Sequence, residues 1–176
     1  MDRYVGKNRV VVTGIGIITP IGIGVDAFWE SAIHGKSGIS MISRFNVESY
    51  PTKIAGEIKN FHPEKYMPGD LADALCRYSQ LGLAAAQMAV RDANLELNSL
   101  NKNKVGISIG VGAETLLYYD EKTAIENNKY TLRIKPPVEN RNIANVISDY
   151  FHFSGQNLVV ATACSSGNQA IELRKI

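Results

Sequence analysis

This sequence of 176 residues has few cysteines, few tryptophans and almost no excess of charge of either sign. It holds two cysteines and one tryptophan, and 19 Lys and Arg against 17 Asp and Glu leave a net charge of +2. Cys76 and Cys164 are far apart and form no CxxC pair, which argues against a disulfide framework and a zinc site, and we predict no metal. Because no cluster of four or more Lys or Arg occurs, we expect no nucleic-acid partner. A reducing cytoplasm is the compartment that fits best.

Long hydrophobic runs are also missing. The longest uncharged run, Val10 to Val25, is interrupted by glycines and by Pro20, and it is too short to span a bilayer as a helix. Lys7 and Arg9 precede it, but no small-x-small cleavage site follows, so we expect neither a membrane span nor a signal peptide.

Apolar residues make up 45% of the chain and charged residues 20%, as in an ordinary globular protein of about one domain. Short apolar runs that end in small residues predict strands at 10–13, 105–110 and 158–162, the first buried on both faces, with a shorter strand at 54–58. Apolar spacing of three and four residues predicts helices between Asp26 and Gly35, over 70–92 and over 142–153, and a helix-like stretch over 168–176. This order of elements predicts an α/β fold, with a mostly parallel sheet and helices on both faces.

Two further features concern the surroundings of this sheet. The later turns of the 70–92 helix are mostly Gly and Ala, which predicts that another backbone approaches it closely. Residues 114–137 form a polar, tyrosine-rich excursion of the kind that covers a site or makes an interface. Two glycine patterns, Gly14-Ile15-Gly16 and Gly35-Lys36-Ser37, lack the remaining glycines of nucleotide-binding motifs, so we interpret them as turns.

The strongest candidate for chemistry is the run Ala-Thr-Ala-Cys-Ser-Ser-Gly at 161–167. It places Cys164 between an apolar strand and a helix-like stretch, where backbone N–H groups and the helix dipole stabilise a thiolate. Small neighbours permit the sharp turn that exposes a nucleophile, and the N–H of Cys164 is a candidate oxyanion donor. On the residues alone, a catalytic cysteine and an inert buried one both fit. Cys76, inside the predicted long helix, is interpreted as a packing residue.

Several motifs occur in order along nearly the whole chain: Val-Val-Val-Thr-Gly-Ile-Gly at 10–16, Thr-Pro-Ile-Gly at 19–22, Gly-Lys-Ser-Gly-Ile at 35–39, Ala-Gly-Glu-Ile at 55–58, Arg-Tyr-Ser-Gln at 77–80 and Thr-Ala-Cys-Ser-Ser-Gly at 162–167. Together they resemble the N-terminal part of a β-ketoacyl-acyl carrier protein synthase, a condensing enzyme of thiolase-like fold. Residues 143–155 are more similar to polyketide synthase modules and the opening to stand-alone fatty-acid synthases, which together favour a discrete polyketide-type synthase.

The resemblance implies that residues 1–176 form the N-terminal half-domain of such a synthase and end within the nucleophile helix. It implies that Cys164 accepts an acyl chain as a thioester from the phosphopantetheine arm of an acyl carrier protein. A carbanion from a decarboxylating malonyl thioester would then attack this acyl group, in fatty-acid or polyketide synthesis. It also implies substrate contacts at Ala113, which aligns with a position that gates the acyl pocket in some relatives, and at Ala163. No cofactor is expected to be bound by the chain itself.

The same resemblance predicts what the chain lacks. The family takes two histidines and a lysine from its C-terminal half, and His34, His62 and His152 match none of those positions, so each is expected to be a surface or packing residue. We therefore expect the isolated chain not to condense, and to act in a homodimer or with a C-terminal half. Because the nucleophile helix lies between two similar halves in the family, Ile171, Leu173 and Ile176 should be exposed here, which predicts poor stability or association.

Two other functions remain open on the sequence. The chain is alternatively a non-catalytic scaffold or partner subunit that pairs with a full-length synthase through residues 158–162, the strand along which family members dimerise. A stand-alone cysteine hydrolase is the third possibility, and it requires a histidine near Cys164.

Overall fold

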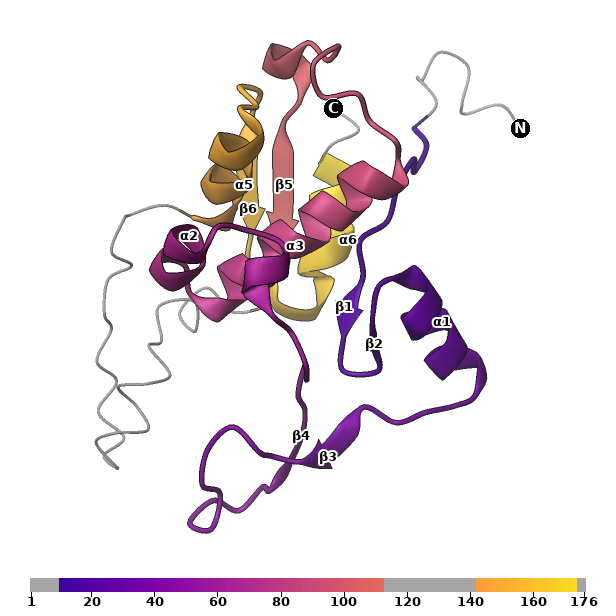
Figure 1. Cartoon of the computed structure of the whole chain (residues 1–176), viewed down its shortest axis with the longest axis vertical. Coiled ribbons are helices and arrows are strands. Elements are labelled where there is room, and N and C mark those ends of the chain that lie inside the picture. Colours follow the sequence, from indigo (N-terminus) through magenta and orange to yellow (C-terminus); the bar gives the residue numbers. More distant parts are fainter. Residues whose placement is uncertain (1–9, 113–141, 174–176) are drawn as a thin grey trace.

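A parallel pair of strands forms the centre of the fold (Figure 1). The structure is a computed structural model that describes residues 10–112 and 142–173. Strand β5 (Ile107–Gly110) pairs in parallel with β6 (Asn157–Val160), with Ile107 opposite Asn157 and Gly110 opposite Val160. These are two of the three strands predicted for the sheet, displaced by one or two residues at their ends.

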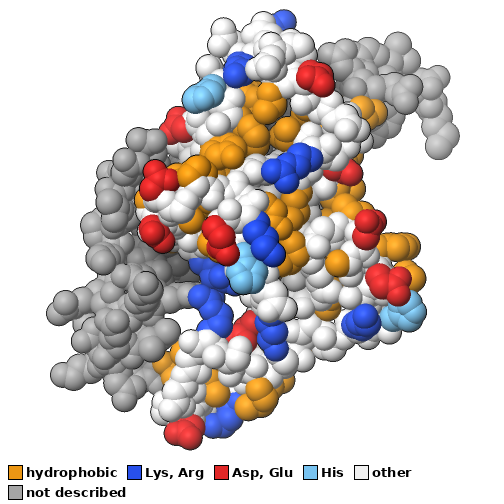
Figure 2. All heavy atoms as spheres, in the orientation of Figure 1, with side chains coloured by type: hydrophobic (Ala, Val, Ile, Leu, Met, Phe, Trp, Pro, Cys, Tyr) orange, Lys and Arg blue, Asp and Glu red, His pale blue; other side chains and the backbone are white. Residues whose placement is uncertain are grey.

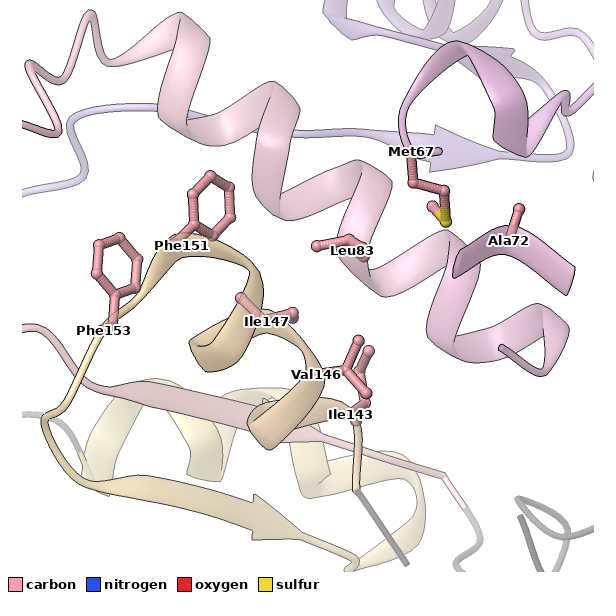
Figure 3. Close-up of a cluster of buried hydrophobic side chains, with 8 residues drawn as sticks. All are labelled: Met67, Ala72, Leu83, Ile143, Val146, Ile147, Phe151 and Phe153. Carbon is pink, nitrogen blue, oxygen red and sulfur yellow. The ribbon is translucent and has the colours of Figure 1, made fainter. Parts of the chain in front are cut away.

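Helices cover both faces of this pair, which confirms the predicted α/β class (Figure 3). Because side chains alternate along a strand, Ile107 and Ile109 face the core on the side of α5 (Ile143–Phe151). Ser108 faces the opposite side, where its hydroxyl donates a hydrogen bond of 2.8 Å to the carbonyl of Ala170 in α6 (Ser166–Glu172). Helix α6 corresponds to the helix-like stretch predicted over 168–176, and it begins two residues earlier, at Ser166.

The core lies between α5 and α3 (Arg77–Asp92), as Figure 3 shows. Gly82 lets the two helices pack closely, since a Cβ built on it would lie 3.0 Å from the Ile143 side chain. Leu83 and Ile143 are fully buried, and burying a side chain of this kind contributes about 1.5–3 kcal/mol. The buried cluster consists of Met67, Ala72, Leu83, Ile143, Val146, Ile147, Phe151 and Phe153.

The prediction of one helix over 70–92 is wrong, because the chain breaks at Leu75, whose backbone is extended at ψ 139°. The break separates α2 (Gly69–Ala74) from α3. Gln80 stabilises it, since its side-chain amide donates to the carbonyls of Ala72 and Leu75 at 2.7 and 3.2 Å. The packing role expected of Cys76 is also wrong: Cys76 is exposed at the start of α3, and its sulfur lies 3.3 Å from the Ser79 hydroxyl.

The predicted strand at 10–13 is also absent, although the segment is described. Val10, Val11 and Val12 are exposed, Val12 by 82%, and the segment pairs with no strand among the described residues. The chain that follows lies on α3 instead, because Gly14 and Gly16 approach the carbonyls of Ala89 and Ala85 too closely for any side chain. Asp92 adds a hydrogen bond of 2.8 Å from the N–H of Ile15. The expected close approach of a backbone to the small residues of this helix is thereby confirmed.

Two antiparallel hairpins and a short helix complete the N-terminal part. Strand β1 (Ile18–Thr19) pairs with β2 (Gly22–Ile23), and α1 (Val25–Ile33) packs against β2. Strand β3 (Ile39–Met41) pairs with β4 (Ile54–Gly56), part of the strand predicted at 54–58. The loop of this second hairpin is held by Glu57, whose pKa is lowered chiefly by a hydrogen bond from the backbone N–H of Ser43. A charged Glu57 carboxylate therefore ties the loop to β4.

Large apolar side chains are exposed on α1 and α6. On α1 the exposed residues Val25, Trp29 and Ile33 recur every four positions, and hydrophobic side chains appear at the right of Figure 2, where α1 lies in Figure 1. Ile171 and Leu173 of the α6 region are 69% and 43% exposed, as predicted, whereas Ile176 and the excursion at 114–137 lie outside the described residues. No helix in the described ranges is long and apolar enough to cross a membrane.

The contact between the N-terminal segment and α3 leads to a prediction about stability. A Gly16→Ala substitution would place a Cβ 1.9 Å from the carbonyl oxygen of Ala85, so the segment must move off the helix. We expect a loss of about 1–3 kcal/mol in the free energy of unfolding, measured by urea denaturation. Gly69→Ala is the control, because its Cβ would meet no atom within 4 Å, and it should leave stability nearly unchanged. Equal stability of the two variants would contradict the packing described.

Candidate active site at Cys164

Cys164 lies in a sharp turn between β6 and α6. The strand ends at Val160, a 3-10 turn covers Ala163–Ser165, and α6 begins at Ser166. The thiol is exposed. The predicted strand, turn and helix order is present, with the cysteine in the turn itself, and the alternative of a buried inert cysteine does not fit its exposure.

The residue before the cysteine has an unusual backbone conformation. Ala163 has φ 54°, in the left-handed region that residues other than glycine seldom adopt, at a cost of about 1–2 kcal/mol. Such a conformation persists only where neighbouring contacts hold it. Because Ala163 directly precedes Cys164, the contacts that hold its backbone also hold the residue that carries the thiol.

Ser166 supplies most of these contacts. Its side chain is 2% exposed, and its hydroxyl oxygen accepts the N–H of Thr162 at 2.8 Å. The same hydroxyl lies within donating distance of two carbonyl oxygens, those of Val111 at 2.6 Å and Ala163 at 2.8 Å. One buried side chain thus connects both sides of the turn with the residue that follows β5.

A second set of hydrogen bonds stays within the turn and the first part of α6. The Ser165 hydroxyl donates to the carbonyl of Thr162 at 2.9 Å, and the Thr162 hydroxyl donates to the side-chain oxygen of Gln169 at 3.0 Å. These bonds involve exposed groups, so each contributes less than a buried one.

The turn and the start of α6 pack closely against the end of β5. A Cβ built on Gly110 would lie 2.5 Å from the backbone carbonyl group of Ser166 and 2.6 Å from the N–H nitrogen of Gly167. Only glycine permits this approach, so a side chain at residue 110 would displace the start of α6.

Two backbone donors of the turn have no hydrogen bond among the described residues, the N–H groups of Ala163 and Cys164, whereas the N–H of Ser165 donates to the carbonyl of Thr162. The role of the Cys164 N–H as an oxyanion donor stays a prediction from the sequence, and no hydrogen bond within the described residues occupies this donor.

The other residues singled out in the sequence do not gather at this turn. Ala113 lies outside the described residues. His34 and His62 are exposed and lie 3.3 and 3.1 Å from the carboxylates of Glu30 and Glu64. His152 is exposed at the C-terminal end of α5. No hydrogen bond or ion pair in the described part of the chain joins any of the three histidines to Cys164. The hypothesis of a stand-alone cysteine hydrolase therefore lacks the base that it requires.

Two residues of the site were missed in the sequence. Gly110 ends an apolar run and looks like any turn glycine, and Ser166 looks like an ordinary first residue of a helix. The only sequence signal was the hydroxyl-rich run after Cys164, which does not show that its second serine bonds to residue 111.

The parallel strand pair, the helices on both of its faces and the cysteine in the strand-to-helix turn agree with the thiolase-like α/β fold that the resemblance implied. The family model described as "Beta-ketoacyl synthase, N-terminal domain" matches residues 7–175, and the chain belongs to this family. It is 33% identical over 169 residues to a 3-oxoacyl-[acyl-carrier-protein] synthase 2 from Synechocystis sp. (strain ATCC 27184 / PCC 6803 / Kazusa). That match covers 94% of this chain and 41% of the relative.

Solved structures agree with this assignment. The ishigamide ketosynthase/chain length factor superimposes with a TM-score of 0.74 at 28% identity, over 97% of this chain and 45% of that one. A structure of a type II PKS acyl-carrier protein in complex with its ketosynthase, bound to the hexaketide, gives a TM-score of 0.65 at 25% identity, over 92% and 44% of the two chains. This chain thus spans about two fifths of the length of the curated relative and less than half of each solved one.

Proposed function

We propose that this chain is the acyl-accepting part of a β-ketoacyl-acyl carrier protein synthase, with Cys164 as the nucleophile. The observation that carries the proposal is the exposed thiol of Cys164 in a turn that buried hydrogen bonds hold in a strained conformation. Membership of the ketosynthase family supports the same role.

The proposed acyl-transfer step uses the exposed thiol and the backbone N–H of Cys164. The Cys164 thiol loses its proton to water, and the thiolate sulfur attacks the carbonyl carbon of an acyl thioester, so that a new carbon–sulfur bond forms while the carbonyl oxygen takes up negative charge. The unused N–H of Cys164 donates to that oxygen. When the intermediate collapses, the bond to the carrier's sulfur breaks, and the pantetheine thiolate leaves and takes up a proton from water. The acyl chain remains on Cys164.

The substrate contacts belong to the same proposal. Ala163, next to the thiol, is proposed to contact the first carbons of the acyl chain, and Ala113 is proposed to contact carbons further along. Ala113 follows Val111, the residue whose carbonyl Ser166 contacts, by two positions. The small side chain at residue 113 favours a longer or branched acyl chain.

The proposed partners are an acyl carrier protein and the part of the synthase that carries the remaining catalytic groups. A related ketosynthase has been solved in complex with its acyl-carrier protein. No hydrogen bond or ion pair of the described residues joins the three histidines to Cys164, so we propose that groups outside this chain carry out the decarboxylation of a malonyl thioester. The proposed setting is fatty-acid or polyketide synthesis in the cytoplasm, with the chain in a homodimer or joined by a C-terminal half.

The direct experiment is the intact mass of the full chain after incubation with an acyl-coenzyme A thioester. We expect one acyl adduct on the chain, lost in Cys164→Ala because that variant lacks the nucleophile. Cys76→Ala is the matched control, since Cys76 is also exposed but lies outside the turn, and it should keep the adduct. A folded chain without an adduct, or an adduct that depends on Cys76, would contradict the proposal.

A second candidate function is a non-catalytic subunit that pairs with a complete synthase. It is favoured by strand β6, which has β5 on one edge and no strand of the described residues on the other.

Mixing the chain with a full-length ketosynthase separates the two functions. The acyl-accepting role predicts the Cys164 adduct whether or not the ketosynthase is present, because the turn is built from this chain's own residues. A scaffold predicts a stable complex by size-exclusion chromatography with light scattering and no adduct. Elution of separate proteins would exclude the scaffold.

A further inference from the structure

We propose that Ser166 is a positioning residue for acyl transfer, whose hydroxyl sets the N–H of Cys164 against the reacting thioester. This inference rests on the proposed role of Cys164 as the acyl acceptor. Ser166 does not touch the substrate in this proposal, and it acts through the turn that it holds.

The burial of Ser166 is the first argument. A hydroxyl that is 2% exposed has to find partners inside the protein, and this one both accepts and donates. It accepts from Thr162, two residues before the cysteine, and lies near the carbonyl of Ala163, one residue before it. This side chain therefore contacts the peptide unit that ends in the Thr162 N–H and the peptide unit between Ala163 and Cys164, whose carbonyl also accepts the backbone N–H of Ser166.

The second argument is the reach of the hydrogen bond to Val111. That bond joins residues 55 apart in the sequence, whereas the bonds of Thr162, Ser165 and Gln169 stay within the turn and α6. Among the side-chain hydrogen bonds of the described residues, it alone links the turn to the residue after β5. Through it, the cysteine turn and Val111 share one anchor.

The consequence concerns the direction of a backbone donor. Ala163 stays at positive φ only while its neighbours hold it, and the orientation of the next peptide N–H, that of Cys164, follows from it. Without the Ser166 hydroxyl, the turn can relax toward ordinary backbone angles. The thiol then stays exposed, but its distance and angle to the oxyanion donor change.

A positioning role and a purely structural role of Ser166 can be separated by comparing two reactions of the Cys164 thiol. Acylation of a thiol by a thioester passes through an oxyanion, whereas alkylation by iodoacetamide does not. Loss of positioning should therefore slow acylation far more than alkylation, while a loss of folding or exposure changes both.

The experiment measures both rate constants for Cys164 in the full chain, by mass spectrometry with peptide mapping to separate Cys164 from Cys76. We expect Ser166→Ala to slow acylation by an acyl-coenzyme A thioester by about tenfold or more and alkylation by less than about threefold. Ser166→Thr keeps a hydroxyl and should acylate within about threefold of the parent chain. Ser108→Ala is the matched control, because it removes another hydroxyl that joins β5 to α6, away from the turn.

The outcomes separate the two proposals. A parent chain that is alkylated but never acylated overturns the acyl-acceptor role and this inference together. Acylation of the parent with no change in Ser166→Ala overturns the inference alone, as does an equal slowing in Ser108→Ala. Where Ser166→Ala does not fold, slow acylation by a folded Ser166→Thr chain overturns it.

Discussion

The close approach of α6 to the end of β5 is the constraint on which the candidate site depends. Gly110 has no side chain, so the first peptide units of α6 can lie against it, and β6 must then turn within a few residues to reach that position. Within this turn Ala163 has positive φ, and the Ser166 hydroxyl donates to the carbonyl of Val111. The exposed Cys164 thiol is the result of these contacts, and no separate element has to present it.

The described structure has a buried hydrophobic core and also exposes several large apolar side chains. Residues of α3 and α5 bury one continuous cluster, which gives the strand pair a fixed position (Figure 3). By contrast, Val12, Trp29 and Ile171 are largely exposed, each at 63% or more. Such side chains on an ordinary globular domain indicate surfaces that another chain or domain covers. The proposal that other parts of a synthase complete the chemistry agrees with this distribution.

Local patterns in the sequence were sufficient for some elements and not for others. The strands β5 and β6, helix α5 and the turn at Cys164 follow from apolar runs and small residues that need no distant partner to be recognised. The Val10–Thr13 run has the composition of a buried strand, but glycines at 14 and 16 place the chain on α3 and leave the valines exposed. The break at Leu75 and the role of Ser166 depend on Gln80 and Val111, whose contacts only the folded chain reveals.

Cross-linking to an acyl carrier protein tests most directly whether the Cys164 turn receives a carrier-bound acyl chain. A carrier whose phosphopantetheine thiol bears a bromoacetyl group forms a thioether when that arm reaches a reactive cysteine. The account predicts a 1:1 cross-linked species that maps to Cys164 and disappears in Cys164→Ala but not in Cys76→Ala. A chain whose Cys164 reacts with free iodoacetamide yet never cross-links to the carrier would contradict it.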